Sequence, residues 1–403
     1  MLEALQRKNK PIIYLMLSKI NFLMNKIYLL TAAFAVMASL SGCSDTELAS
    51  IDTAQEKTPI GFHTVGSQMG SRATIITSSN LKDYSFNVYA FNRNDDGTDG
   101  TVFMGTNDQS QGNEGGVNIS YNDGKWDYTT PADLKYWPTN ALNFYAVSPV
   151  SEDNHNTWQI SKDKKEFNVL LHNEYEDPDN SAKNVDVMYA ITPNQTKTTS
   201  NGGTVQMQFH HILSQVSFKA RNDIPNMEVK IKGIEIYNFH NQAYFTLPTT
   251  KVAPTQTNWK WSEGLYTSTG YTVVKDKSID VGNTETLISM DGPMLFIPQK
   301  LNKWTTTAES PKSITQADAS KESYLKISCR IKLDGSYRIG TETTFDNLYV
   351  PFGADWQPGK HYVYTLIFGG GYKQDGTPIL TKINITADTE PWKEDLNELV
   401  TQQ

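Results

Sequence analysis

The sequence predicts an all-β protein built from two β-sandwich domains, and three observations support this. Aromatic residues are abundant, with 20 Tyr, 16 Phe and 8 Trp in 403 residues, and such side chains favour pleated, half-buried surfaces. Apolar and polar residues alternate in many short segments that turn-forming residues separate. Apart from one turn over 210–214, no useful helical period lies between the leader and the C-terminal tail, and the chain is too long for one core.

The N-terminal residues are typical of a lipoprotein leader. Residues 27–40 are uncharged and apolar and follow Lys26; as a helix they would span about 21 Å, less than the about 30 Å of a bilayer core. Such a run indicates a signal peptide. Small residues precede Cys43, as in a bacterial lipobox. We predict a signal peptide over 1–42, with Met24 as a candidate start, and lipidation of Cys43; the alternative is an ordinary signal peptide with a chance cysteine.

Residues 43–72 are expected to form a polar tether, with one short strand around 60–65. Arg72 lies in a run of small residues just ahead of Ala73 and of the first strong strand pattern. An exposed arginine in a flexible segment is a natural target for an arginine-specific protease. From spacing alone, a surface arginine without a role is an equal alternative.

The strands of the N-terminal domain, predicted over 73–209, follow from the two-residue period. Apolar residues share one face in four segments, 84–90, 142–146, 185–189 and 205–209. Turn formers fill 92–100. A polar run over 196–204 marks the neighbourhood of the domain boundary, which we place near Phe209.

The C-terminal domain, predicted over 210–403, begins its strands at 229–236, where Gly233 switches the apolar face as at a β-bulge. The clearest strand covers 325–333 and precedes Asp334-Gly335, a strong hairpin signal. Cys329 lies on its apolar face and is expected to be a core residue. Strands over 362–368 and 383–385 complete the domain.

The sequence contains no motif of a common enzyme class, so we predict no enzyme activity, no cofactor and no metal site. The Ser-elbow, zinc-protease, P-loop and C-x-x-C patterns are all missing. The two cysteines, Cys43 and Cys329, exclude a disulfide framework and a cysteine-rich zinc site. The net charge of −8 argues against nucleic-acid binding.

Two patterns suggest a cation but are better explained structurally. His210 and His211 would point to opposite faces of a continuing strand, so they are poorly placed to share one ion. The loop 92–99 partly resembles a calcium loop, but Phe103 occupies the twelfth position, where a bidentate glutamate is required. We therefore expect structural histidines and a solvated hairpin loop.

Tryptophans carry the alternative function, a monomeric surface lipoprotein that binds glycan. Trp126 or Trp158 would then be platforms on which sugars stack, and Trp137 is a further candidate. In a β-sandwich such residues more often fill the core or an edge, and this is the interpretation we favour.

Several segments together resemble the fimbrillin family (the Mfa-like group) of Bacteroidales. They are the lipobox leader, the junction Ser71-Arg72-Ala73-Thr74, and the segments 88–91, 135–146, 185–190, 209–214 and 356–364. The resemblance implies two tandem transthyretin-like β-sandwich domains after a lipoprotein signal peptide and a short tether. It also implies a lipoprotein precursor of a type V pilus subunit, located at the outer membrane or in the fimbrium on the cell surface.

The resemblance further implies how such a subunit assembles. In related subunits an arginine-specific protease removes the lipidated segment and the first strand, and a donor strand from a neighbour fills the groove. By position, Arg72–Ala73 matches this cleavage site. The implied partners are other pilus subunits through strand exchange, the outer membrane through acyl chains before processing, and a host or bacterial surface ligand.

The C-terminal tail departs from the family pattern. Shaft subunits are similar in donating a C-terminal segment as a strand, but Leu396, Leu399 and Val400 recur here at helical spacing. A tail that cannot donate would make this chain a tip or accessory subunit, which we carry forward as a hypothesis.

Overall fold

The computed structural model describes residues 57–65, 76, 80–105, 115–150, 157–172, 184–261, 266–267, 270–275, 277–289, 294–369, 371–379 and 383–391. The chain divides into two units, residues 1–56 and residues 57–403, and all the described residues lie in the second unit. Cys43, Arg72, Ala73 and the tail after 391 lie outside the described residues.

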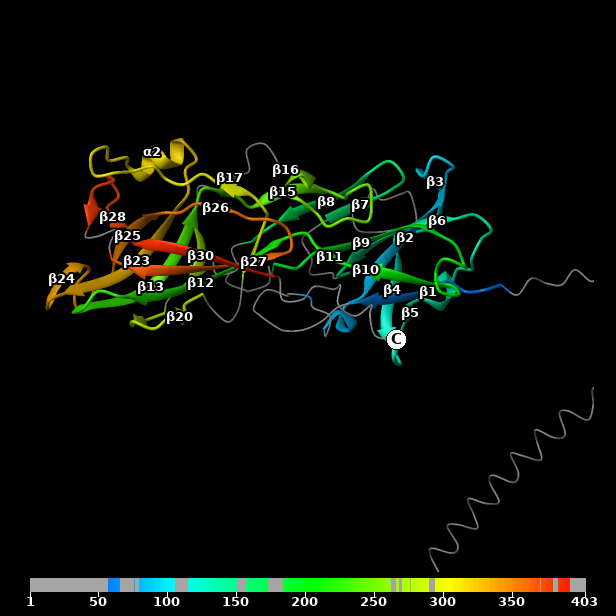
Figure 1. The fold of residues 1–403 in the computed structure, drawn as a ribbon, viewed down its shortest axis with the longest axis horizontal. Coiled ribbons are helices and arrows are strands. Elements are labelled where there is room, and N and C mark those ends of the chain that lie inside the picture. Colours follow the sequence, from blue (N-terminus) through cyan, green and yellow to red (C-terminus); the bar gives the residue numbers. More distant parts are fainter. Residues whose placement is uncertain are drawn as a thin grey trace, which may run out of the picture. The chain divides into compact units, whose positions relative to one another are not determined.

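The largest sheet of the described residues has nine strands in the order β10-β1-β5-β4-β2-β6-β9-β11, with β3 paired to β2 (Figure 1). Its strands are β1 (Gly61–Val65), β2 (Phe86–Arg93), β3 (Asp99–Met104), β4 (Val117–Asn122), β5 (Lys125–Tyr128), β6 (Leu142–Ser148), β9 (Met188–Gln195), β10 (Thr204–Gln208) and β11 (His210–His211).

Two further sheets form the C-terminal part. The five-stranded sheet, ordered β20-β12-β27-β30 with β21 paired to β12, contains β12 (Ser214–Asn222), β20 (Thr286–Leu287), β21 (Met294–Phe296), β27 (Lys360–Phe368) and β30 (Asn384–Pro391). The eight-stranded sheet is built around β13-β23-β25 and contains β13 (Met227–Tyr237), β18 (Tyr271–Val274), β19 (Ile279–Val281), β23 (Tyr324–Leu333), β24 (Ser336–Ile339), β25 (Asp346–Pro351), β28 (Gly371–Tyr372) and β29 (Pro378–Ile379).

The smaller elements complete the described structure. A four-stranded sheet, ordered β16-β15-β8-β7, contains β7 (Thr157–Ile160), β8 (Lys165–Leu170), β15 (Gln242–Thr246) and β16 (Trp259–Trp261). Two strand pairs join β14 (Phe239–His240) to β17 (Tyr266–Thr267) and β22 (Lys300–Leu301) to β26 (Ala354–Asp355). The helical elements are η1 (Leu81–Asp83), η2 (Pro131–Asp133), η3 (Gln256–Asn258) and α2 (Ile314–Ala319). The all-β prediction is confirmed.

The central strands of the nine-stranded sheet, β2, β6 and β9, are buried on both faces over most of their length. In β2, Phe86 and Val88 join one hydrophobic cluster with the β1 side chains, whereas Tyr89 and Phe91 join a second cluster that includes the four-stranded sheet. Because both sets of alternating positions are buried, β2 lacks the polar face that a one-sided strand would show.

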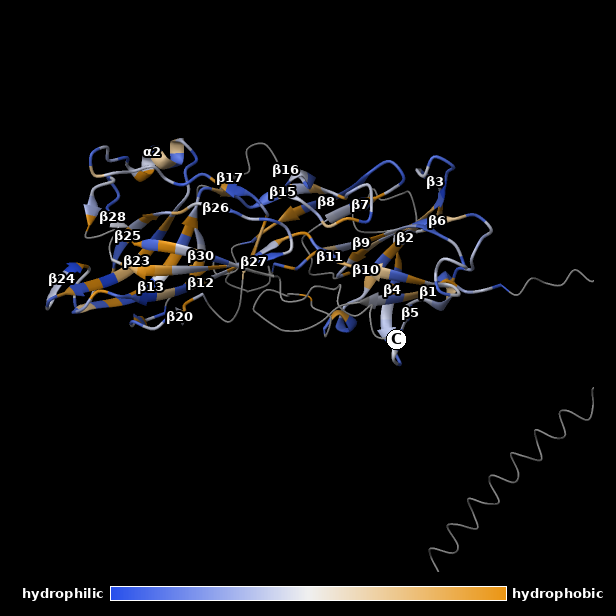
Figure 2. Ribbon diagram, viewed as in Figure 1, coloured by the Kyte–Doolittle hydropathy of each residue, from blue (hydrophilic) through white to orange (hydrophobic). Residues whose placement is uncertain are grey.

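The C-terminal sheets pack face to face as a sandwich. Side chains from the five-stranded sheet, such as Phe218 and Tyr364, share one cluster with side chains from the eight-stranded sheet, such as Ile231 and Ile327. Orange and blue alternate along β13 and β23 in Figure 2, as expected for strands with one buried face.

The four-stranded sheet joins segments from both sides of the predicted boundary near Phe209. Strand β8 pairs antiparallel with β15 over five positions, from Leu170 opposite Gln242 to Glu166 opposite Thr246. A division at 209/210 assigns these two strands to different domains, and the boundary itself stays a prediction.

Local details of the C-terminal strands agree with the sequence. The register of β13 against β23 shifts between Ile231 and Gly233, which confirms the bulge. Asp334 and Gly335 both have positive φ, 49° and 79°, as a tight hairpin requires. Cys329 is 0% exposed, and burial, with Asp346 nearby, raises the pKa of its thiol to about 12.

Two local expectations were wrong. Residues 210–214 do not form a helical turn, because His210 and His211 pair with β9 as strand β11 and β12 begins at Ser214. Helix α2 was not expected. It begins at a capping box in which the Ser313 hydroxyl accepts from the Gln316 N–H and the Gln316 side chain accepts from the Ser313 N–H.

The loop between β2 and β3 is a hairpin loop whose polar side chains form hydrogen bonds within the loop, and the sequence indicated such a loop. The Asp96 carboxylate accepts hydrogen bonds from both the N–H and the hydroxyl of Thr98, at 3.0 and 2.6 Å, and the Asn94 side chain donates to Thr98. These contacts hold the Asp96 carboxylate inside the loop, and they lower its pKa.

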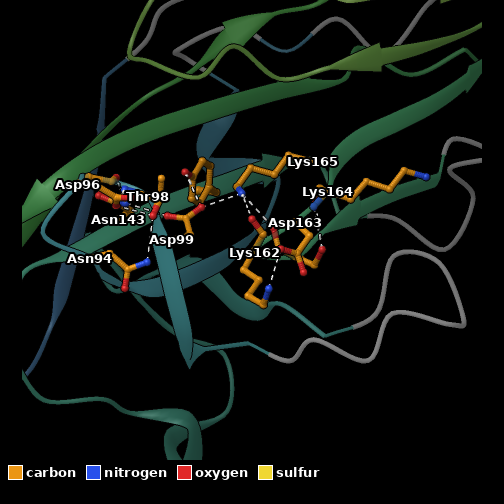
Figure 3. Close-up of polar contacts among 12 residues, drawn as sticks. Asn94, Asp96, Thr98, Asp99, Asn143, Lys162, Asp163, Lys164 and Lys165 are labelled. Atoms are coloured by element: carbon orange, nitrogen blue, oxygen red, sulfur yellow. Dashed lines mark hydrogen bonds and ion pairs between the residues drawn. The ribbon is translucent and has the colours of Figure 1, made fainter.

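A nearly buried ion pair fastens this hairpin to the four-stranded sheet (Figure 3). Lys165 Nζ lies 2.7 Å from Asp99 Oδ2, and the two side chains are 16% and 5% exposed. The same carboxylate accepts from the Tyr145 hydroxyl at 2.9 Å and from the Asn143 amide at 2.8 Å. The pair therefore links β3, β6 and β8.

Asp99→Ala should lower the free energy of unfolding by about 3 kcal/mol, since it leaves the Lys165 ammonium buried without its counter-charge. The matched control is Asp163→Ala, which removes an exposed ion pair with Lys162. The Lys162 side chain is 46% exposed and the Asp163 side chain 76%. Urea unfolding of both variants measures the difference. Equal losses would show that burial of the Asp99 pair contributes nothing.

Candidate functional site

Strand β1 is inserted between β10 and β5. It runs parallel to β10 over five residue pairs, from Gly61 opposite Thr204 to Val65 opposite Gln208, and it meets β5 in an antiparallel bridge between Phe62 and Trp126. Within the described strand order, β10 is an end strand that β1 connects to β5 (Figure 1). Without β1, a groove would separate β10 from β5; we call this space the β1 groove.

Apolar side chains fix β1 in this groove. Ile60 and Phe62 are 1% and 5% exposed and belong to the hydrophobic cluster of the nine-stranded sheet. The Phe62 ring lies 6.3 Å from Phe86, 5.9 Å from Tyr128 and 6.2 Å from Phe144, in edge-to-face geometry with each. Such contacts add to area burial, so Phe62 is the anchor of the strand.

Backbone hydrogen bonds fix the segment that leads into β1. The Ile60 N–H donates to the Lys135 carbonyl at 2.9 Å, and the Trp137 N–H donates to the Thr58 carbonyl at 3.0 Å. The Tyr128 hydroxyl donates to the Ile60 carbonyl at 3.1 Å. The chain is thus held in place before it enters the groove.

A second anchor lies shortly after β1. Ile76 is 0% exposed, and its N–H donates to Asp186 Oδ2 at 3.0 Å. The predicted cleavage pair, Arg72 and Ala73, falls between Val65 and Ile76 in the sequence. A cut there would separate β1 from the following domain and leave the Ile76 anchor with that domain.

The two histidines have different structural roles. His211 Nδ1 lies 2.9 Å from Oδ2 of Asp186, a carboxylate that is completely buried. His210 lies against the Tyr189 ring, at a centroid distance of 5.7 Å, and burial, with His211 and Lys251 nearby, lowers its pKa to about 4. These contacts give each histidine a structural partner. In the part of the chain that the structure describes, no group of three His, Cys, Asp or Glu side chains is placed to hold a metal ion.

The tryptophans suspected of binding glycan belong to the core. Trp126 and Trp158 are 8% and 2% exposed, and the Trp158 indole donates to the Tyr89 hydroxyl at 3.0 Å. Trp137 is partly buried and donates to the Gly203 carbonyl beside β1. The core interpretation is confirmed, so these residues are not the stacking platforms that the glycan alternative required.

Among the described residues, the tryptophan with an exposed side chain is one that the sequence pattern did not single out. Trp261 is 39% exposed, at the end of strand β16, which reads Trp259-Lys260-Trp261. The spacing puts both tryptophans on one face of a strand, and the pattern did not indicate that the core ends between them.

The C-terminal strand β30 lies at an edge of the five-stranded sheet. It pairs antiparallel with β27 over eight positions, from Asn384 opposite Ile367 to Pro391 opposite Lys360. Ile385 packs partly against the core, but the side chains at 384 and 386–389 are exposed. Backbone pairing thus dominates its attachment.

None of the helices that the structure describes is long and apolar enough to cross a membrane.

Comparisons with known proteins give one family and one fold. A family model described as Fimbrillin-like matches residues 73–392. The search of curated proteins found no match. A crystal structure of a fimbrial protein from Bacteroides vulgatus ATCC 8482 is similar over 83% of this chain and 99% of that chain, with 16% identity and a TM-score of 0.53. The tip fimbrial protein Mfa3 from Porphyromonas gingivalis, with a C-terminal truncation, is similar over 77% and 94% of the two chains, with 9% identity and a TM-score of 0.33.

Phe62→Ala should weaken the binding of β1 by about 3 to 5 kcal/mol, because it empties the space between three aromatic rings. The control is His63→Ala, since His63 is exposed in the same strand. Hydrogen exchange of the β1 amides measures the effect. Equal protection in the two variants would contradict the anchoring role of Phe62.

His210 should contribute an acid-sensitive component of stability. Its pKa of about 4 in the folded chain lies below its ordinary value of 6.5, so between these values the unfolded chain binds more protons and stability falls as the pH drops. His210→Gln should flatten this part of the profile. Urea unfolding at a series of pH values checks this, and an unchanged slope in His210→Gln would contradict it.

Proposed function

The chain belongs to the fimbrillin-like family, and we propose that it is a fimbrial subunit that assembles by exchanging β1 for a strand of a neighbouring subunit. Fimbrillin-like proteins are structural proteins of the cell surface rather than enzymes. The observation that carries the proposal is the insertion of β1, a short strand with an aromatic anchor, between β10 and β5.

The order of segments supports removal of β1. The family match begins at residue 73, after β1 and at the predicted junction Arg72–Ala73. An arginine-specific protease that cuts there would release residues 43–72, which include β1. The chain would reach the outer membrane as a lipoprotein acylated at Cys43, and it would leave this anchor on cleavage.

The chemistry of the opened groove supports strand exchange. Loss of β1 would uncover the pocket of Phe86, Tyr128 and Phe144, and the unpaired backbone of β10 would be a template for another strand. A donor strand would restore both the backbone hydrogen bonds and the apolar contacts, which is the physics of β-strand addition. Burial of the exposed apolar surface would make the exchange strongly favourable.

We further propose two tandem transthyretin-like β-sandwich domains, 73–209 and 210–403. One hydrophobic cluster draws its residues from 60–209 and another from 216–383, which supports two cores, and a third cluster, from 89–297, contains residues of both domains. The sheet that pairs β8 with β15 would join the two domains.

The C-terminal residues bear on the place of this subunit in the fimbrium. Strand β30 already pairs along β27, and the tail beyond it has a helical rather than a strand period. A subunit that accepts a strand but donates none would stand at the tip or act as an accessory.

Arg72→Lys should block maturation, because the substitution keeps the charge but removes the arginine that the protease recognises. We expect an N-terminus at Ala73 in the native subunit and none there in the variant, together with loss of polymers in gels run under mild denaturation. Replacing the junction with the site of another protease, and adding that protease, should restore assembly. Normal polymers from Arg72→Lys would contradict the proposal.

Deletion of Lys393 to Gln403 tests the place of the subunit. If the tail is not a donor, the truncated chain should join polymers as well as the full chain does. The measurement is incorporation of tagged subunits into fimbriae on cells. Loss of incorporation would show that the tail is a donor strand and that the tip hypothesis is wrong.

A further inference from the structure

A cavity of about 430 Å³ lies beside β14, β16 and β22, away from the β1 groove. Its lining includes Trp261, His240, Lys300 and Lys321, together with side-chain amides from Asn238, Gln256 and Gln299. A concave site with one large aromatic group and a few converging polar groups is the usual form of a small-ligand site.

Trp261 supplies an exposed, fixed aromatic surface. Its indole stacks on the His240 ring at a centroid distance of 4.6 Å and an interplanar angle of 15°. Trp261 pairs in register with Ala243, on the same side of the strand as Trp259, but Trp259 is buried in the hydrophobic cluster and Trp261 extends beyond it. The cavity thus begins where the core ends. A flat, braced indole suits the C–H face of a sugar ring, which is apolar on that side and polar at its rim.

Hydrogen bonds hold the wall of the cavity in place. The Gln299 side chain accepts from the His240 N–H and donates to the His240 carbonyl, both at 2.8 Å. Gln256 donates to Asp355 at 2.8 Å, and Asn238 donates to Asp318 at 2.9 Å. Because these contacts orient the wall before any ligand arrives, little ordering is needed on binding.

The charge of the lining favours an anion. Lys300 and Lys321 both line the cavity, and the described lining contains no carboxylate, although the whole chain has a net charge of −8. The nearby Asp318 and Asp355 accept hydrogen bonds from the amides of the wall. Two lysines that line the same cavity as a stacking platform suit a sugar that carries a carboxylate or sulfate.

We propose that this cavity binds an acidic saccharide, with the sugar ring on Trp261 and its anionic group near Lys300 and Lys321. The site would give the subunit a ligand of its own, so the inference goes beyond the proposed function, which concerns assembly alone. It uses no residue of the β1 groove. Binding and assembly can therefore succeed or fail separately.

The test is calorimetric titration of the uncleaved chain with three acidic probes, a galacturonate oligosaccharide, a hyaluronan oligosaccharide and sialyllactose, and with neutral lactose. We expect at least one acidic probe to bind and lactose to bind much more weakly. Trp261→Ala should weaken binding about tenfold, the effect of losing one aromatic contact. The double variant Lys300→Glu, Lys321→Glu should abolish the preference for acidic sugar.

The matched control is Tyr244→Ala, since Tyr244 is similarly exposed on the neighbouring strand β15 and pairs with Lys260 rather than with Trp261. It should bind as the parent does. The proposal would be overturned if none of the probes bound, or if lactose bound as tightly as the acidic probes. It would also be overturned if Tyr244→Ala lost as much affinity as Trp261→Ala. Polymer formation by Trp261→Ala, followed in parallel, should be unchanged, and a loss of polymers there would show that the variant disturbs the fold.

Discussion

The contact of the Phe62 ring with Phe86, Tyr128 and Phe144 joins a strand from outside the family-matched region to the core of the N-terminal part. Strand β10 depends on the same strand for its connection to β5. The Phe62 side chain fills a space between three aromatic rings, so a missing β1 would open a groove lined by apolar side chains on that face of the sheet. The stability of the precursor and the capacity to accept a strand would thus come from one set of contacts.

The proposed assembly and the proposed ligand binding would use different parts of the chain. After cleavage the β1 groove would present aromatic side chains and unpaired backbone, which suits any strand with correctly spaced apolar residues. The cavity at Trp261 has fixed amides and two lysines, which suits a small charged ligand. The two proposed surfaces therefore differ in chemistry, one suited to a strand of another subunit and the other to a small ligand.

The sequence predicted strands from the alternation of their residues, and this signal is clearest where one face of the strand is polar. Strand β23, its hairpin at Asp334-Gly335 and the burial of Cys329 are examples. The partner of β1 was not predictable, because its pairing with β10 joins residues more than a hundred positions apart. The exposure of Trp261 was not predictable either, because alternation shows which face of a strand a residue lies on but not where the core beneath that face ends.

The most direct measurement is hydrogen exchange of the β10 amides, residues 204–208, in three states of the subunit. We predict protection in the uncleaved precursor, where β1 covers them, rapid exchange in the monomer cleaved after Arg72, and renewed protection in the polymer, from which peptides of residues 57–65 are missing. Persistent protection in the cleaved monomer, or retention of residues 57–65 in the polymer, would contradict strand exchange at the β1 groove.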